Sequence, residues 1–297
     1  MSLRALGLRT VVGVAAALVL AVSCGDDTAG SGGSGASGPG AGGAGGGGPG
    51  PRPVPPPTFL SSMPERVVAI GDLHGDGDAM MEALRIGGLI DASGAWTGGK
   101  TVVVQTGDQL DRGDDDRAIL DYLEVLADEA WAAGGALYVL NGNHETLNVE
   151  LYFDYVTPGA FVDFAEFDPG GSDPVLDLFP QAERGRAAAF RPGGPYATLL
   201  AGHNSMMQIG DTVFVHGGVL PEHLEGLGGL GLEGMNDVIR RWMLGEISTG
   251  HEDAIGDLGP LWARDYSDLP DQAACAKLDQ VLSELGATRM VVGHTVQ

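Results

Sequence analysis

The sequence predicts an α/β domain with a partly parallel sheet. Three short apolar runs of strand length alternate with two segments in which apolar residues recur at helical spacing. Each apolar run ends at a polar turn that contains glycine, and in open α/β sheets ligands bind beyond the carboxyl ends of the strands. The three turns are therefore expected to meet in space.

The local pattern justifies each element of this first unit. The expected strands and helices are residues 66–70, 78–89, 101–106, 117–133 and 136–140. The strands are rich in valine, isoleucine and leucine, and the longer helix carries Ile119, Leu120 and Leu123 on one side. The acidic run 114–116 precedes that helix, complements its N-terminal dipole and is expected to be solvated.

The second half of the chain has a weaker pattern. Residues 150–200 mix aromatic residues with many glycines and prolines, and they are expected to form a helical cap over the sheet. The expected packing residues of this cap are Phe153, Tyr155, Phe161, Phe164 and Phe167. Strands are expected at 207–209, 212–215 and 289–292, with helices at 235–247 and 272–285.

The N-terminus carries the pattern of an export signal. Two arginines precede an apolar run at 11–22, which is too short to span a bilayer because a spanning helix needs about 20 apolar residues. The run ends in Ala-Val-Ser-Cys at 21–24, which resembles a bacterial lipobox and makes Cys24 the expected lipidation site. Residues 1–24 are thus interpreted as a lipoprotein-type signal peptide, and the chain as an exported lipoprotein of the cell envelope, on its periplasmic or extracellular face.

The chain is expected to hold one folded domain on a tether. Residues 25–63 are rich in glycine, serine and proline, so they have little apolar surface to bury and are expected to be disordered. The folded domain is expected at 64–297, as a monomer that meets the membrane only through the lipid anchor. The 40 acidic and 16 basic residues give a net charge of −24, which excludes nucleic acid as a bulk partner.

Five polar turns carry the candidate metal-binding and catalytic residues. They read Gly-Asp-Leu-His-Gly at 71–75, Gly-Asp-Gln-Leu-Asp-Arg-Gly at 107–113, Gly-Asn-His-Glu at 142–145, Val-His-Gly-Gly at 215–218 and Gly-His-Thr at 293–295. Carboxylate, amide and imidazole ligands without cysteine suit Mn, Fe or Zn. Two such ions about 3.5–4 Å apart, sharing one carboxylate, suit an in-line attack on phosphorus.

Together these turns resemble the calcineurin-like metallophosphoesterases, and within them the phosphoprotein phosphatase superfamily. The superfamily carries GDxHG, GDxxDRG and GNHE followed by two further histidines, and its fold is a β-sandwich flanked by helices. A finer resemblance is to the Shewanella-like protein phosphatases. It rests on GNHETLN at 142–148, YVTP at 155–158, FVHGGVLP at 214–221, GPLW at 259–262 and GHTVQ at 293–297.

The resemblance implies a role for each matching residue. The implied ligands of two divalent metal ions are Asp72 and His74 for the first, Asp108 for both, and Asn143, His216 and His294 for the second. His144 would be the general acid, oriented by Asp111. The implied phosphate-binding residues are Arg112, Arg264 and Asn143. A water activated by the metals would attack phosphorus.

The implied activity is hydrolysis of phosphomonoesters, with a phosphoprotein (Ser/Thr or Tyr) or a small phosphoester as substrate. Two alternatives stay open: a diadenosine polyphosphate hydrolase from a sister branch, and a catalytically weak, surface-binding lipoprotein. Family members usually continue for a few strands beyond the last histidine, whereas this chain ends three residues after His294. The chain is therefore expected to be truncated or to have a sandwich that is open on its C-terminal side.

Overall fold

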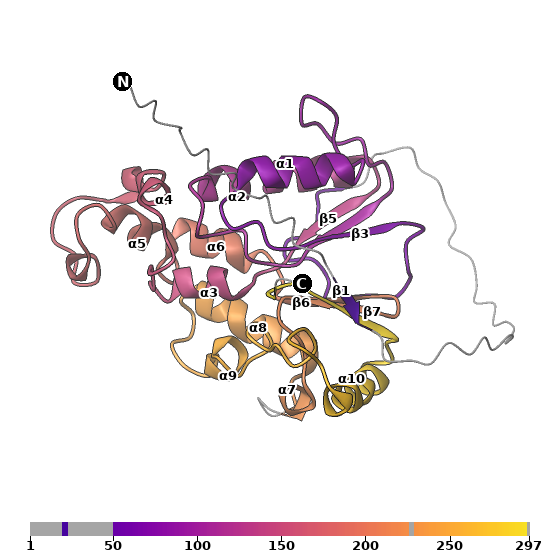
Figure 1. Ribbon diagram of the computed structural model, residues 1–297. Helices are drawn as coiled ribbons and strands as arrows, with labels where there is room; N and C mark the ends of the chain where they lie inside the picture. Colours follow the sequence, from indigo (N-terminus) through magenta and orange to yellow (C-terminus); the bar gives the residue numbers. More distant parts are fainter. Residues whose placement is uncertain (1–19, 23–49, 226–228, 296–297) are drawn as a thin grey trace, which may run out of the picture.

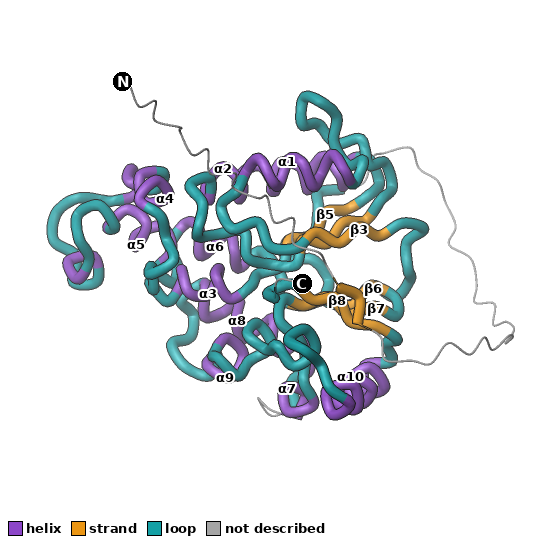
Figure 2. Tube along the Cα trace, in the orientation of Figure 1, coloured by secondary structure: helices purple, strands orange, loops and turns teal. Residues whose placement is uncertain are grey.

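The computed structural model describes residues 20–22, 50–225 and 229–295 and shows two facing sheets with helices on their outer sides (Figures 1 and 2). The first sheet has the order β3-β4-β5, and both neighbouring pairs are parallel. Its strands and the two helices that connect them are β3 (Val67–Ile70), α1 (Gly77–Ile86), β4 (Val102–Gln105), α2 (Asp116–Ala132) and β5 (Ala136–Val139). The predicted β-α-β-α-β unit is confirmed.

The second sheet is mixed and has the order β1-β8-β7-β6-β2. β6 and β7, at two of the expected strand positions, form an antiparallel hairpin, β8 is parallel to β7, and β2 is parallel to β6. β1 pairs antiparallel with the other side of β8. The strands are β1 (Leu20–Val22), β2 (Phe59–Leu60), β6 (Met206–Ile209), β7 (Thr212–Val215) and β8 (Arg289–Val292).

Strand side chains alternate between two layers of core, as the period of two requires. Val102, Val104 and Tyr138 of the first sheet pack against Met207 and Phe214 of the second, between the sheets. The opposite face of the first sheet packs on α1 and α2. The outer face of the second sheet packs on α7 (Pro221–Glu225), α8 (Gly231–Met243) and α10 (Gln272–Leu285). This is the expected helix-flanked β-sandwich.

Short helices within residues 150–200 form the expected cap, at the left of Figure 1. They are α4 (Pro158–Val162), the 3-10 turns η1 (Ala165–Phe167) and η2 (Leu176–Leu178), α5 (Arg184–Phe190) and α6 (Pro195–Ala201). Two further short helices are α3 (Asn143–Val149) and α9 (Glu252–Ile255). Phe164 is fully buried in the cap against Phe190 and Tyr196, with ring centroids 5.0 and 4.9 Å away. Tyr155, expected as a packing residue, is instead 42% exposed.

The last part of the expected tether lies against the domain. Residues 50–63 are described, and β2 within them adds a strand to the second sheet. Arg52 forms ion pairs with Glu124 and Asp128 of α2, at 2.6 and 2.9 Å. Besides the strand pairing and Arg52, Thr58 accepts a hydrogen bond from Asn236 at 3.0 Å and Leu60 packs on the core between the sheets. These scattered contacts leave no periodic apolar pattern in the sequence. The rest of the tether, and most of the expected signal peptide with Cys24, lie outside the described residues. Among the helices that the structure describes, none is long and apolar enough to cross a membrane.

The docked segment predicts a pH dependence of stability. Burial raises the pKa of Glu124, but the hydrogen bonds and charges of His203 and Arg52 outweigh it and lower this pKa to about 2, from 4.5 in the unfolded chain. A lowered pKa means that Glu124 stabilises the fold above pH 4.5 and that this contribution is lost as the pH falls towards 2. We expect the free energy of unfolding, measured by urea titration, to fall less between pH 6 and pH 3 in Glu124→Gln than in the wild type.

Glu284→Gln is the matched control, because Glu284 is exposed on α10 and has no ion pair or hydrogen bond within the described residues. Its pH dependence should equal that of the wild type. An equal fall in Glu124→Gln and the wild type would contradict the role given to this carboxylate.

Candidate functional site

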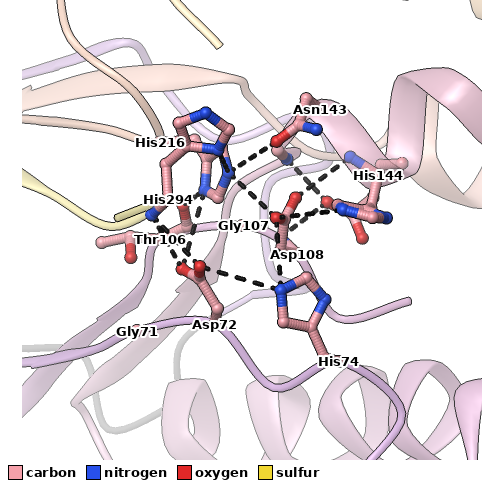
Figure 3. Close-up of polar contacts among 12 residues, drawn as sticks. Gly71, Asp72, His74, Thr106, Gly107, Asp108, Asn143, His144, His216 and His294 are labelled. Atoms are coloured by element: carbon pink, nitrogen blue, oxygen red, sulfur yellow. Dashed lines mark hydrogen bonds and ion pairs between the residues drawn. The ribbon is translucent and has the colours of Figure 1, made fainter. Parts of the chain in front are cut away.

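The five polar turns meet at one edge of the sandwich, as Figure 3 shows. β3, β4 and β5 lead into the first three turns, and β7 and β8 of the facing sheet lead into the last two. All six residues expected as metal ligands lie there together with His144: Asp72, His74, Asp108, Asn143, His216 and His294. Residues as far apart in the chain as Asp72 and His294 are in contact, since the His294 main-chain N–H lies 3.1 Å from both Asp72 carboxylate oxygens.

Two glycine pairs allow the turns to approach backbone to backbone. A Cβ on Gly113 would lie 2.2 Å from the carbonyl oxygen of Gly75, and a Cβ on Gly107 would lie 2.7 Å from the Cα of Gly142. Both distances are impossible for real side chains, so the motif glycines are required by the closeness of the turns.

Several functional residues have left-handed backbone conformations. They are His74, Asp108, Asp111, Arg112 and His294, with φ between 49° and 72°. Such conformations cost non-glycine residues roughly 1–2 kcal/mol each and persist where the surroundings over-determine them. The site is therefore a strained part of the chain that the rest of the fold holds in place.

Glu145 supplies much of that hold. Its carboxylate is completely buried and accepts main-chain N–H groups from Asp108, Gln109, Leu110 and Gly142, at 2.8, 2.9, 3.2 and 2.6 Å. Burial and the charge of Asp108 raise the pKa of Glu145 to about 7, while the N–H groups of Gly142 and Asp108 lower it. The Glu of the Gly-Asn-His-Glu turn thus binds the second turn to the third.

Asp108 is the centre of the ligand set. Its carboxylate is 2% exposed, and Oδ2 lies 3.1, 3.7 and 3.9 Å from the Nε2 atoms of His216, His74 and His144. Two groups of candidate ligand atoms share it: one with His74 and His144, the other with His216 and His294, and the atoms of each group lie within 4.8 Å of one another. This is the position expected for a bridging carboxylate.

Asp72 borders both groups. Its Oδ2 lies 3.9 Å from His74 Nε2 and its Oδ1 lies 3.9 Å from His216 Nδ1. The first group of ligand atoms contains His144 in the place where Asp72 was expected, because the Asp72 carboxylate faces the His294 main chain. The imidazole of His144 therefore lies as close to the ligand set as a ligand would.

The contacts around the second group show which nitrogens face the site. Arg264 Nε lies 3.0 Å from His294 Nε2, which leaves Nδ1 as the His294 nitrogen that faces the ligand set, 3.1 Å from His216 Nε2. His216 in turn donates from Nδ1 to the Thr106 carbonyl at 2.9 Å. Its Nε2 then faces Asn143 Oδ1 at 2.9 Å and Asp108 Oδ2 at 3.1 Å.

His216 Nε2, Asn143 Oδ1 and Asp108 Oδ2 present their lone pairs to one another. Three such atoms need a positive charge between or upon them. Burial lowers the pKa of His216, but the charge and hydrogen bond of Asp108 outweigh it and raise the pKa to about 9, so a proton can supply that charge. A divalent cation can replace the proton, and the oxygen and imidazole donors suit Mn, Fe or Zn. The residues present therefore fit the metal that the sequence implies.

Arg112 has the corresponding place at the first group. Its two terminal nitrogens lie 2.9 Å from His74 Nε2 and 3.1 Å from His144 Nε2. A guanidinium only donates, so His74 accepts at Nε2 and carries its proton on Nδ1, whereas His144 accepts from Arg112 only while its own Nε2 is unprotonated. His74 Nδ1 then donates to the Leu110 carbonyl at 3.1 Å. Both expected phosphate-binding arginines, Arg112 and Arg264, thus lie against the ligand histidines from opposite halves of the site.

His144 and Asp111 form the expected pair. His144 Nδ1 lies 2.6 Å from Asp111 Oδ2, and both side chains are buried. Burial lowers the pKa of His144, but the hydrogen bond to Asp111 and the charges of Asp108 and Asp111 outweigh it and raise the pKa. The remaining nitrogen, Nε2, faces the ligand set, so a protonated His144 can deliver a proton there.

Arg186 is a supporting residue that the sequence did not reveal. It is fully buried in α5 and donates to Asn148 Oδ1 at 2.8 Å, to Asp116 at 2.6 Å and to Asp111 at 3.3 Å. Asn148 donates to Asp111 as well, at 3.0 Å. The Phe164 and Phe190 rings each lie 5.0 Å from the guanidinium carbon of Arg186. Arg186 stands in an alanine-rich helix with no motif around it, so no sequence signal marked it.

Asp116 corrects one expectation. The acidic run before α2 was expected to be solvated, but Asp116 is fully buried, and its carboxylate accepts both Arg186 and the Asp111 main-chain N–H, the latter at 3.0 Å. The reason is the partner on α5, seventy residues later, which supplies the charge that burial requires. Burial and the nearby Asp111 raise the pKa of Asp116 to about 6 against the opposing charge of Arg186.

Two aromatic residues border the site. The Tyr155 ring lies 5.0 Å from the His144 ring and 5.9 Å from the Arg112 guanidinium, and the Trp262 ring lies 5.7 Å from the His294 ring. Tyr155 was expected to pack in the cap core, with a substrate-lining role as the alternative for that region. The Val-Thr-Pro turn after it carries it to the surface, where its main-chain carbonyl accepts Arg112 N–H at 2.9 Å.

Comparisons with known proteins agree with this geometry. The chain is 40% identical over 266 residues to Shewanella-like protein phosphatase 2 of Arabidopsis thaliana, covering 79% of this chain and 67% of that protein. It is 29% identical over 239 residues to Shewanella-like protein phosphatase 1 of Plasmodium berghei, covering 78% of this chain and 61% of that protein. The chain thus spans about two thirds of the length of these relatives.

A solved structure supports the same relationship. The cold-active protein-tyrosine phosphatase of a psychrophilic Shewanella species matches with a TM-score of 0.63 and 26% identity, over 80% of this chain and 68% of that one. A family model described as calcineurin-like phosphoesterase matches residues 65–297, which include every turn of the site. The chain therefore belongs to the calcineurin-like phosphoesterases and is a metal-dependent phosphoesterase.

Proposed function

We propose that the chain is a protein phosphatase that uses two divalent metal ions to hydrolyse phosphomonoesters. The observation that carries the proposal is the single Asp108 carboxylate shared by two groups of ligand atoms, with a guanidinium against each group. The names of the relatives as protein phosphatases support a phosphoprotein substrate, on either serine/threonine or tyrosine.

The two ions would be held as the resemblance implies. Asp72 and His74 would hold the first, Asn143, His216 and His294 the second, and Asp108 both. When bound, such ions stabilise negative charge on phosphoryl oxygens and lower the pKa of water, which makes it a nucleophile near neutral pH.

His144 would act as the general acid. Its link through Nδ1 to Asp111 favours the imidazolium and points Nε2 at the site, where it can protonate the leaving oxygen of the phosphoester. The Asp111 carboxylate, bonded by Asn148 and Arg186, would hold the ring in that orientation throughout.

Arg112 and Arg264 would bind the phosphoryl oxygens. Both donate to imidazole nitrogens and to no carboxylate within the described part of the chain, so their positive charge is not neutralised by an ion pair. A guanidinium binds phosphate bidentately, and charge fixed in advance where negative charge develops lowers the barrier.

We also propose that the protein is exported and tethered to the cell envelope through lipid on Cys24, as a monomer. The support is the sequence pattern of residues 1–24 and the glycine-rich stretch that follows. In this arrangement the site would act on substrates outside the cytoplasm.

The first test is hydrolysis with added Mn²⁺ of p-nitrophenyl phosphate, a phosphoserine peptide, a phosphotyrosine peptide and diadenosine tetraphosphate. We expect turnover of a phosphopeptide, lost on chelation, and a fall in kcat of about 10²–10⁴-fold in His144→Ala because the leaving oxygen loses its proton donor. His203→Ala is the matched control, since it removes another buried imidazole that contacts a carboxylate, Glu124, outside the site.

The outcomes separate the alternatives. Turnover of diadenosine tetraphosphate without turnover of phosphopeptide would favour the dinucleoside hydrolase. Equally low activity in the wild type and His144→Ala would favour a binding role, and each result contradicts the protein phosphatase.

Arg186 gives a second prediction. Arg186→Met leaves the buried Asp116 carboxylate without its ion-pair partner and Asp111 without one of its donors, and it should lower the free energy of unfolding by about 3–5 kcal/mol. Arg186→Met with Asp116→Asn removes the unpaired charge and should recover much of the stability. Its kcat should stay about tenfold below the wild type with little change in KM, because Asp111 has lost a donor that positions it. A double variant with wild-type kcat would limit Arg186 to packing.

Lipidation is tested directly by metabolic labelling. The full chain expressed in a bacterial host should incorporate labelled palmitate, and Cys24→Ser should not, because the thiol that carries the lipid is missing. Cys275→Ser is the matched control and should be labelled like the wild type. A wild-type chain without label would exclude the anchor.

A further inference from the structure

A pocket of about 590 Å³ adjoins the site on the side of the cap. It is lined by Leu147, Glu150, Tyr152, Tyr155, Asp257 and Trp262. Glu150 caps the end of α3 and Asp257 follows α9, and these two helices lie one above the other at the left of Figure 1. The metal-site functions assigned above involve none of these six residues.

The walls of the pocket are shared with the site. Tyr155 contacts the His144 ring, and Trp262 contacts the His294 ring, with ring centroids 5.0 and 5.7 Å apart. A group in the pocket is therefore separated from each half of the metal site by one aromatic ring. Consecutive residues of an extended peptide advance by about 3.3–3.6 Å, so a side chain one or two residues from the phosphorylated one can reach the pocket.

The charge in the pocket is negative and unbalanced. Neither the Glu150 nor the Asp257 carboxylate has a hydrogen bond or an ion pair within the described residues. Partial burial and the charge of Asp257 raise the pKa of Glu150, as expected for two carboxylates that lack a counter-ion.

The aromatic residues suit a cation as well. Tyr152 and Tyr155 line the pocket, and their side chains are 44% and 42% exposed, so a ligand can reach them. A guanidinium or ammonium group is attracted to the faces of Tyr and Trp rings, and Arg in particular stacks on them. Carboxylates and aromatic faces together select a long basic side chain over an apolar or acidic one.

We propose that this pocket binds an arginine or lysine side chain of a phosphopeptide, next to the residue that is dephosphorylated. The inference rests on the protein phosphatase activity proposed above and names its substrate class as phosphopeptides with a nearby basic residue. Glu150 and Asp257 are then specificity residues, and they act on binding of the peptide and not on the phosphoryl group.

The test uses pairs of phosphopeptides that differ only in the charge of one side chain. Each carries either arginine or citrulline, its neutral analogue of similar shape, at one of the two positions before or after the phosphorylated residue. We expect kcat/KM to be about fivefold higher for arginine at the favoured position, through KM, as a cation contact with exposed carboxylates and aromatic faces implies.

The variant Glu150→Gln/Asp257→Asn should bring the arginine-to-citrulline ratio close to one. Taking the ratio within each variant cancels any general change in activity. The matched control is Asp279→Asn/Glu284→Gln, which removes the same two charges from the exposed face of α10 and should keep the wild-type ratio.

Each other outcome contradicts the proposal. A wild-type ratio of one, or a ratio that survives in Glu150→Gln/Asp257→Asn, removes the basic side chain from the pocket. A variant that changes the phosphotyrosine-to-phosphoserine preference instead would assign the pocket to the tyrosine ring. Hydrolysis of p-nitrophenyl phosphate with no turnover of any phosphopeptide would overturn the proposed function and this inference together.

Discussion

The site depends on one buried carboxylate. Asp108 is 2% exposed, and a carboxylate taken out of water costs several kcal/mol unless positive charge and hydrogen bonds surround it. Burial raises its pKa, but the neighbouring His216, His144 and His74 outweigh burial and lower it. Since His216 comes from the second sheet and the other histidines from the first, satisfying this one charge joins the two sheets at the edge where their strands end.

A strained backbone makes that arrangement possible. Asp108 itself has a left-handed conformation, and its main-chain N–H is held by the buried Glu145 carboxylate at 2.8 Å. Glu145 holds Gly142 in the same way. A Cβ on Gly107 would lie 2.7 Å from the Cα of Gly142, and a Cβ on Gly142 would lie 2.7 Å from the main-chain nitrogen of Asp108. Ligand, supporting carboxylate and glycines therefore form one unit, which explains why the motif needs all three residue types at this spacing.

The local sequence pattern was enough to predict the strands, helices and polar turns, but not the long-range contacts that hold the turns in place. Strands and helices around the site follow from apolar periodicity, and the six expected ligands lie together because strand ends of a sandwich converge. Asp116 was misplaced because its burial depends on Arg186, a partner seventy residues away with no motif. The docking of residues 50–63 was missed for a related reason, since an added edge strand and scattered side-chain contacts leave no pattern. Tyr155 looked like cap core because aromatic composition does not say which way a turn faces.

The net charge of −24 acquires a second meaning from this geometry. A strongly acidic surface repels an anionic substrate at distances up to the Debye length, about 8–10 Å at physiological salt. Inside the site the sign is reversed by Arg112, Arg264 and the cations that the ligands suit. A phosphopeptide with a basic residue beside the phosphate carries charges of both signs. Its basic side chain would face the acidic surface and pocket, and its phosphate would face the positive site. If Arg112 and Arg264 bind phosphate as proposed, unpaired carboxylates one aromatic ring away from them give an acidic protein a way to recognise a phosphorylated one.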